Sequence, residues 1–372
     1  MNARDGIGAA IPSLDGIRAV AILLVVAAHA GLERQVPGGL GVTVFFVLSG
    51  YLITTLLRIE QARSGSIDLR AFYLRRVLRL GPPLLVVVAL SALLVRIVPS
   101  NGYTGEGLLA VLFYYGNYYM IVQDFHGVPA GIGVVWSLAV EEHFYLLYPP
   151  LALVLMRRCS PPRAAALLLA ACGAVLLWRG WLATHGATAS YISMATDTRI
   201  DAILAGAALA FAANPWLAPP RRDARRDLLL GTACVALLLL SLLWRDPLFR
   251  LSLRYTVQSA AAAGLLWLAV AHGRRTPLLN TRVAVYLGSV SYSVYLIHHL
   301  LIYALLRLWP QLPWYALLAL GLGLSLLVAE PMRRWIERPC AGLRRRLAEG
   351  ARRRRRGAAP AAARATMAEQ AR

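Results

Sequence analysis

The chain has 372 residues, of which 58% are hydrophobic, and it carries a formal net charge of +21. Long stretches of about 20 residues contain almost no charge, and this is the length that crosses a lipid bilayer. These features exclude an ordinary soluble globular protein and predict a polytopic membrane protein. The basic residues are all arginines, and they lie in short loops between the apolar stretches and in the C-terminal tail. Anionic lipid headgroups and membrane topology explain this placement better than nucleic acid does, so no nucleic-acid partner is expected.

The apolar stretches predict an all-α transmembrane bundle of about ten spans, which form one membrane domain over residues 1–340. The spans are expected at residues 17–32, 40–57, 80–98, 135–156, 164–182, 198–213, 228–244, 255–271, 284–306 and 314–332. Residues 107–122 are apolar but contain Asn117 and several tyrosines. A re-entrant or interfacial segment is therefore expected there instead of an eleventh span.

Arginines are concentrated in alternate loops, which indicates that these loops are cytoplasmic. The loop between the second and third spans is rich in them, whereas no arginine lies between Ile97 and Met156. Both termini are therefore expected in the cytoplasm. The use of arginine without lysine is typical of a GC-rich bacterium, so the predicted location is the bacterial cytoplasmic (inner) membrane. Residues 341–372 are rich in Ala and Arg and predict a basic, disordered or partly helical cytoplasmic tail that lies on anionic lipid.

The first span carries two ionisable residues, Arg18 and His29, within the stretch SLDGIRAVAILLVVAAHAG. Eleven residues separate them, which on a helix turns both side chains to one face at an axial distance of about 16 Å. Alone, Arg18 fits a snorkelling arginine, and His29 fits a polar residue satisfied between helices. Their shared face favours two positions along one cavity. Ala28-His29-Ala30 imitates a signal-peptide cleavage site, but the first span is expected to be retained.

Two further motifs follow in the second and third spans. Ser49 and Gly50 are expected to serve helix packing, because nothing in the local sequence activates Ser49 as a nucleophile. Arg76 and Arg79 form an R-x-x-R spacing at the cytoplasmic end of the third span. Residues three apart are neighbours on a helix, so two guanidinium groups can grip one polyphosphate. The alternative for this pair is a plain positive-inside cluster.

The fourth span begins WSLAVEEHFYLLYPP and places Glu141, Glu142 and His143 inside an apolar helix. A carboxylate there is costly unless it is paired or functional, and a salt bridge to an arginine of another span is the alternative. The two glutamates are expected at the depth of His29. One of them therefore has the right height to orient that imidazole and stabilise its protonated form.

The later spans carry fewer distinctive groups. Arg199 and Asp201 begin the sixth predicted span, and Tyr292, Tyr295 and His298 lie in the ninth. The last span is followed by WIERPC, where a local Glu-Arg pair and a proline stop explain the sequence without a function. The four cysteines lack metal-ligand spacing, so no metal site is expected.

Seven stretches, taken in order, resemble the acyltransferase-3 family of bacterial integral-membrane O-acyltransferases. They are SLDGIRAVAILLVVAAHAG, FFVLSGYLIT, FYLRRVLRLGPP, WSLAVEEHFYLLYP, DTRIDAILAGA, SYSVYLIHH and IERP. The resemblance implies ten spans, a cytoplasmic acyl-CoA donor such as acetyl-CoA, and a hydroxyl-bearing acceptor. That acceptor would be a cell-surface sugar, a lipid-linked glycan or a glycosylated natural product. Some members carry a C-terminal SGNH-type hydrolase domain, and the form without it is expected here.

The resemblance also implies roles for individual residues. The family's R-x10-H motif falls on Arg18 and His29, and its R-x-x-R motif falls on Arg76 and Arg79. Glu141 matches the first carboxylate of the V-E-E-Q-F-Y pattern, in which this chain has a histidine in place of the glutamine. The role of that histidine position stays open.

These observations lead to one expected mechanism and two alternatives. The arginines of both motifs would bind the phosphates of acyl-CoA, and His29 would act as general base on the acceptor hydroxyl, which attacks the thioester directly. The arginines lie inside and His29 towards the outside, so the acyl group would cross the membrane during transfer. A transporter or exporter of a polar or lipid-linked substrate also needs buried charges, but the sequence has no inverted repeat. A membrane scaffold would not need carboxylates within a span.

Overall fold

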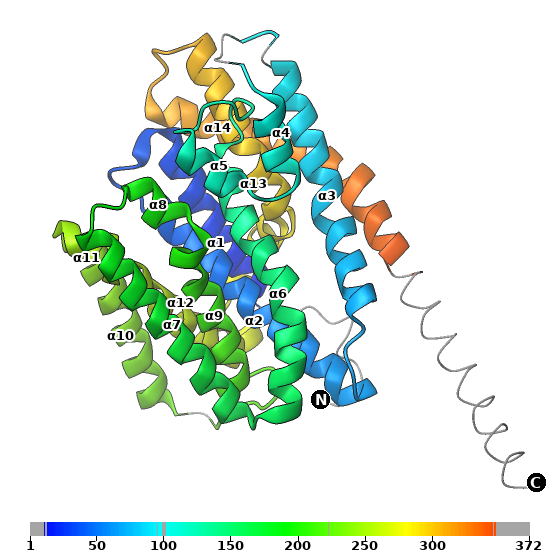
Figure 1. Ribbon diagram of the computed structural model, residues 1–372, viewed down its shortest axis with the longest axis vertical. Helices are drawn as coiled ribbons and strands as arrows, with labels where there is room; N and C mark the ends of the chain where they lie inside the picture. Colours follow the sequence, from blue (N-terminus) through cyan, green and yellow to red (C-terminus); the bar gives the residue numbers. More distant parts are fainter. Residues whose placement is uncertain are drawn as a thin grey trace, which may run out of the picture.

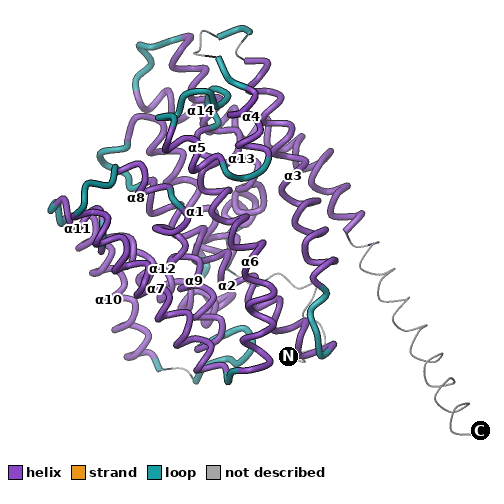
Figure 2. The backbone as a smooth tube through the Cα atoms, viewed as in Figure 1, coloured by secondary structure: helices purple, strands orange, loops and turns teal. Residues whose placement is uncertain are grey.

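The computed structural model describes residues 11, 13–94, 96–98, 102–221, 223–344 and 346. In this part of the chain the regular secondary structure is helical, and Figure 2 shows no strand. Long helices pack side by side into one bundle (Figure 1). They are α1 (Leu14–Ala27), α2 (Gly38–Ser64), α3 (Leu69–Leu94), α6 (Trp136–Arg158), α7 (Pro161–Thr184), α9 (Thr196–Ala212), α10 (Ala224–Leu243), α12 (Leu253–His272), α13 (Arg282–Leu308) and α14 (Trp314–Met332).

Each of these helices overlaps one predicted span, which confirms the all-α polytopic bundle. Within the described ranges, eight helical stretches are long and apolar enough to cross a membrane. The other two predicted spans are α9, which has only 17 residues, and α12. α9 packs between α2 and α7 in the middle of the bundle, and α12 packs against α10 while burying Gln258 and Ser259. Neighbouring helices thus cover the two least apolar spans.

Residues 107–122 form two short helices, α4 (Gly105–Leu112) and α5 (Gly116–Val122), joined at Tyr114, where φ is 59°. With 8 and 7 residues, neither is long enough to cross a bilayer. They lie at the end of the bundle opposite to the loop between α6 and α7 (Figure 1). This agrees with the predicted re-entrant or interfacial segment. The other short helices are η3 (Gly133–Val135), α8 (Ala189–Met194), α11 (Pro247–Leu251), η4 (Gly273–Arg275) and η5 (Leu278–Asn280).

Two glycines allow α2 and α9 to pack in close contact at the centre. A Cβ atom on Gly50 would lie 1.8 Å from the carbonyl oxygen of Ile203, and one on Gly206 would lie 2.0 Å from that of Val47. No side chain fits in that space, so these two backbones meet only because both positions are glycine. The packing role predicted for Gly50 is confirmed.

The end of the last span differs from the prediction. α14 continues through a π-helical turn, η6 (Arg333–Glu337), and on as a helix to Arg344, with Pro331 and Pro339 inside it. The proline stop expected in WIERPC is therefore wrong. A proline ring clashes with the carbonyl one turn earlier, and the wider π turn before Pro339 displaces that carbonyl.

Most of the predicted basic tail, including the arginine run at 352–356, lies outside the described residues. Its first residues, 341–344, belong to the helical extension of α14. The division into a membrane domain and a tail therefore stays a prediction.

Candidate active site

A cavity of about 90 Å³ lies between α1, α2, α3, α6 and α13, with room for several water molecules. We call it the arginine cavity. Its polar lining groups are Arg18, Ser49, Arg76, Arg79, Ser137, Glu141, Tyr145, Ser291, Tyr292 and Tyr295. The structure therefore brings the three predicted arginines together with Glu141, although these residues come from three different helices.

Glu141 is held by two hydroxyl groups. Ser49 Oγ donates to its Oε1 at 3.1 Å, and the Tyr145 hydroxyl donates to its Oε2 at 2.8 Å. Sequence reasoning gave Ser49 a packing role only, because its partner lies 92 residues away in the chain. Tyr145 follows Glu141 by one helical turn, and this i, i+4 spacing could have predicted their hydrogen bond from the sequence.

The arginines of the cavity have different surroundings. Arg18 pairs with Asp15 at 2.6 Å on its own helix, with 19% of its side chain exposed. The guanidinium of Arg76 lies 4.6 Å from the centre of the Tyr145 ring, which is a cation–π distance. The salt bridge considered as the alternative role for the glutamates is absent, since within the described residues neither Glu141 nor Glu142 lies at ion-pair distance from an arginine.

Glu142 does not line the arginine cavity, and it has one unusual feature. Its Oε1 is buried and has no hydrogen-bond partner. Tyr114, in the turn outside the spans, lies nearby, and burial together with the Glu142 charge raises the pKa of Tyr114. The tyrosine hydroxyl therefore stays protonated. His143 donates to or accepts from Thr196 Oγ1 at 2.7 Å, so this departure from the family pattern makes a contact with α9.

His29 lies in a π-helical turn, η2 (Ala28–Leu32), that ends α1, and such turns are frequent at functional sites. Its ring faces α13, where its centre is 5.1 Å from that of His298 and 4.9 Å from that of His299. We call these three residues the histidine cluster. The expected contact between His29 and a glutamate is wrong, because Glu141 bonds to Ser49 and Tyr145 instead. Positions along two helices determine the depth of such groups but not the direction in which each helix turns them.

The hydrogen bonds of the cluster assign its tautomers. His298 Nδ1 lies 2.7 Å from the Tyr295 carbonyl and 3.1 Å from the Val294 carbonyl, so it carries the proton. His298 Nε2 is then an acceptor, and His29 Nδ1 donates towards it at 3.2 Å and towards the Val25 carbonyl at 3.0 Å. His29 Nε2 therefore keeps its lone pair, which is the state a general base needs.

A second cavity of about 210 Å³ lies on the other side of the histidine cluster. We call it the loop cavity, because the loop between α5 and η3 forms most of it. It is lined by Gly102, Met120, Phe125, His126, Gly127, Val128, Pro129, Ala130, Gly131, Gly133, His299, Tyr303 and Arg307. Sequence reasoning did not single out His299 or this loop, and the only signal was the second histidine of SYSVYLIHH.

α13 connects the two cavities through the cluster. Tyr295 lines the arginine cavity, and its ring centre is 5.7 Å from that of His298, one turn further along the helix. His299 lines the loop cavity. Along one face of α13, residues of the arginine cavity are therefore followed by the histidines and then by residues of the loop cavity. Arg18 lies near the first part of this face, and His29 lies beside its histidines.

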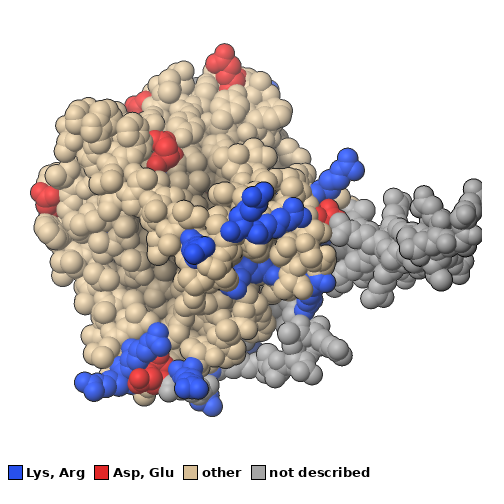
Figure 3. Space-filling model, turned by 60° about the horizontal axis from the view of Figure 1, so that its bottom comes forward, with Lys and Arg blue, Asp and Glu red and all other residues tan. Residues whose placement is uncertain are grey.

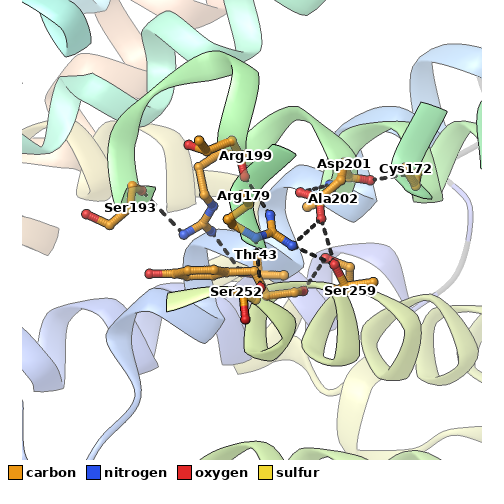
Figure 4. Close-up of polar contacts among 12 residues, drawn as sticks. Thr43, Cys172, Arg179, Ser193, Arg199, Asp201, Ala202, Ser252 and Ser259 are labelled. Carbon is orange, nitrogen blue, oxygen red and sulfur yellow. Dashed lines mark hydrogen bonds and ion pairs between the residues drawn. The ribbon is translucent and has the colours of Figure 1, made fainter. Parts of the chain in front are cut away.

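Arg199 and Asp201 belong to a separate buried network (Figure 4). Arg179, which is fully buried, bonds to Asp201 Oδ2 at 3.0 Å, to the Ser252 carbonyl at 2.8 Å and to Thr256 Oγ1 at 2.6 Å. These bonds join α7, α9 and the start of α12. Arg199 lies 4.0 Å from the centre of the Tyr255 ring. The network holds the bundle together and does not line the arginine cavity or the loop cavity.

Comparison with known proteins identifies the family. The model of the acyltransferase domain matches residues 11–330. The peptidoglycan O-acetyltransferase OatA of Listeria monocytogenes is 29% identical over 350 residues, which cover 88% of this chain and 55% of that protein. A protein of Staphylococcus aureus strain COL, provisionally named an O-acetyltransferase, is 28% identical over 356 residues, or 88% of this chain and 57% of that protein. No solved structure matches the chain at a significant level.

YrhL of Bacillus subtilis, provisionally named a peptidoglycan O-acetyltransferase, is 35% identical over 210 residues, which cover 54% of this chain and 33% of that protein. The chain spans a little more than half the length of the Listeria and Staphylococcus relatives. The family model, in contrast, matches most of the chain, and the matched residues include the three motif arginines and His29. The chain therefore belongs to the acyltransferase-3 family of membrane-embedded acyltransferases, and its fold is a multi-pass helical bundle.

Proposed function

We propose that this protein transfers an acyl group, with acetyl as the first candidate, from acyl-CoA to a hydroxyl group of a carbohydrate. The observation that carries the proposal is the histidine cluster that contains His29. Its His299 lines the loop cavity, and its His298 lies beside Tyr295, which lines the arginine cavity. A base between two cavities suits a reaction that joins an anionic donor to a separate acceptor.

The residues of the arginine cavity fit a thioester donor. Arg18, Arg76 and Arg79 supply positive charge for its phosphates, and guanidinium groups bind phosphate in a bidentate manner. Apolar side chains such as Phe45 and Leu52 line the same cavity and suit the uncharged arm and the acyl group. Glu141 and Glu142 would balance the arginine charge when no donor is bound.

The proposed reaction needs one base and no covalent intermediate. His29 Nε2 takes the proton of the acceptor hydroxyl, and that oxygen forms a bond with the thioester carbonyl carbon. The carbon–sulfur bond then breaks, and the sulfur receives the proton back from His29. The products are an ester and the free CoA thiol. A positioned general base contributes about 10²–10⁴-fold to such a step.

The loop cavity is the proposed acceptor site. Phe125 and Tyr303 offer aromatic rings for a sugar, and Arg307 offers hydrogen-bond donors. Relatives of this chain are named peptidoglycan O-acetyltransferases, so a cell-wall glycan is the first acceptor to test. Lipid-linked glycans and glycosylated natural products are the next acceptors to test.

We also propose the orientation of the protein in a bacterial cytoplasmic membrane. The arginine-rich alternate loops favour cytoplasmic termini, which turns the arginine cavity towards the cytoplasm and the loop cavity to the outside. The donor and the acceptor would then approach His29 from opposite sides.

The test uses the purified protein in lipid nanodiscs with radiolabelled acetyl-CoA and chitooligosaccharides, muropeptides or lipid-linked glycans. Label that moves to an acceptor as an alkali-labile ester supports the function. Thioester hydrolysis that is independent of every acceptor, or no use of acetyl-CoA, would contradict it. A transporter would retain bound substrate without consuming the thioester.

His298 is expected to act as a positioning residue for His29. His298→Leu removes the acceptor at Nε2 and should lower kcat about tenfold or more, because His29 Nδ1–H then keeps only the Val25 carbonyl and loses the side-chain contact that orients its ring towards α13. His298→Gln keeps an acceptor near that position and should restore most of kcat, with KM for acetyl-CoA unchanged in both variants. A merely structural role for His298 predicts equal loss of kcat in the two variants, and that result would contradict the assignment.

A further inference from the structure

A third cavity, of about 230 Å³, lies where α3 meets the helical extension of α14. We call it the C-terminal cavity. It is lined by Arg79, Arg333, Glu337, Arg338, Ala341 and Arg344. Four arginines therefore face one glutamate around a single hollow. Arg338 and the glutamate lie in the stretch WIERPC, for which no function was expected from the sequence.

The charges in this cavity are only partly compensated. Arg333 forms two hydrogen bonds with Glu330, at 2.7 Å and 2.8 Å, and shares that carboxylate with Arg334. The Ser293 hydroxyl donates to the carboxylate of Glu337. Within the described residues, Arg79, Arg338 and Arg344 form no ion pair. Like charges that share a cavity repel one another, and a multiply charged anion removes that repulsion.

Arg79 connects this cavity to the candidate active site, because it lines both the C-terminal cavity and the arginine cavity. Arg76, in contrast, lies over the Tyr145 ring on the Glu141 side. The two arginines of the R-x-x-R motif thus face different surroundings, and only Arg79 faces the C-terminal segment. Figure 3 shows the molecule from the end that is at the bottom of Figure 1. Basic side chains gather on this end, and acidic side chains are few.

We propose that Arg338 and Arg344 bind the 3′-phosphate of acyl-CoA, while its diphosphate lies at Arg79, between this cavity and the arginine cavity that Arg18 and Arg76 line. This inference rests on the proposed function for the identity of the donor. The nucleotide of CoA carries a 3′-phosphate as well as a diphosphate, and several guanidinium groups around one hollow match such a polyanion. A phosphate of a lipid headgroup has the same chemistry, so the test has to separate the two.

The experiment measures direct binding of adenosine 3′,5′-bisphosphate, and of 5′-AMP as the probe with one phosphate fewer, to protein in neutral-lipid nanodiscs. The Arg338→Gln/Arg344→Gln variant is expected to weaken bisphosphate binding by at least tenfold, with a smaller effect on 5′-AMP. Arg334→Gln is the matched control, since Arg334 lies in the same segment but pairs with Glu330 and does not line the cavity. Thermal unfolding of each variant verifies its fold.

The outcomes show whether the bound phosphate belongs to CoA or to a lipid headgroup. They also distinguish failure of this site from failure of the proposed function. Equal bisphosphate affinity in the double variant and the parent protein would overturn the proposal. Loss of cardiolipin binding with unchanged bisphosphate binding would also overturn it, in favour of a lipid site. A raised KM for acetyl-CoA, with little change for dephospho-acetyl-CoA, would support it. Bisphosphate binding by a parent protein that consumes no thioester would retain the site and reject the proposed function.

Discussion

Replacement of His29 by glutamine is expected to lower kcat by about 10²–10⁴-fold, which is the usual contribution of a general base. The glutamine keeps the polarity and approximate size of the side chain but cannot take up a proton at pH 7. Because His29 does not line the arginine cavity, binding of acetyl-CoA should stay within about twofold of the parent protein. Transfer of the label measures kcat, and isothermal titration measures the binding of acetyl-CoA.

The matched control for this variant is His185→Gln. His185 is an exposed histidine at the end of α7, stacked on Trp181, and it does not line the arginine cavity or the loop cavity. Its replacement should leave transfer unchanged. If His29→Gln retained the activity of this control, the assignment of the base would be wrong. If both kcat and donor binding collapsed, His29 would serve the structure of α1 instead.

Asp201→Ala is expected to be the most destabilising of the substitutions considered. It leaves the fully buried guanidinium of Arg179 without its carboxylate, and breaking a buried pair costs about 3–5 kcal/mol. The pair joins α7 to α9 in the middle of the bundle (Figure 4), so the loss should appear in global unfolding. Denaturant titration of the protein in mixed micelles measures the change.

Asp227→Asn supplies the comparison for this prediction. Asp227 pairs with His272 at 3.0 Å, but 35% of the histidine side chain is exposed, and such pairs contribute about 0–1 kcal/mol. Removing both partners of the buried pair, in Arg179→Met/Asp201→Leu, should cost less than Asp201→Ala alone because no charge is left unpaired. An Asp201→Ala protein as stable as Asp227→Asn would show that the buried network does not hold the bundle.

The sequence was sufficient to predict the helices because apolar length dominates in a membrane. Helical periodicity was the basis for expecting Arg18 and His29 along one cavity, and that expectation is wrong, because Arg18 lines the arginine cavity and His29 lines neither the arginine cavity nor the loop cavity. The partner of His29 was not predictable in this way. Two groups at one depth in a bundle still need helices turned towards each other, and Glu141 is turned to α2 and α3 while His29 is turned to α13.

Two other features depended on distant parts of the chain. Ser49 has no activating neighbour in sequence, and only the packing of α2 against α6 brings it to Glu141. The segment after Pro339 stays helical because a π turn precedes it, and a sequence pattern that treats proline as a stop misses such a turn. As a result, the C-terminal cavity emerged only from the structure.

The central claim is that donor and acceptor reach His29 from opposite faces of the membrane. Sealed proteoliposomes that contain chitooligosaccharide inside and receive labelled acetyl-CoA outside test it directly, with detergent-opened vesicles as the reference. Transfer across the membrane should give acetylated sugar inside the sealed vesicles, and none when donor and acceptor are both outside. Product that forms only when both substrates share one side would contradict transfer across the membrane.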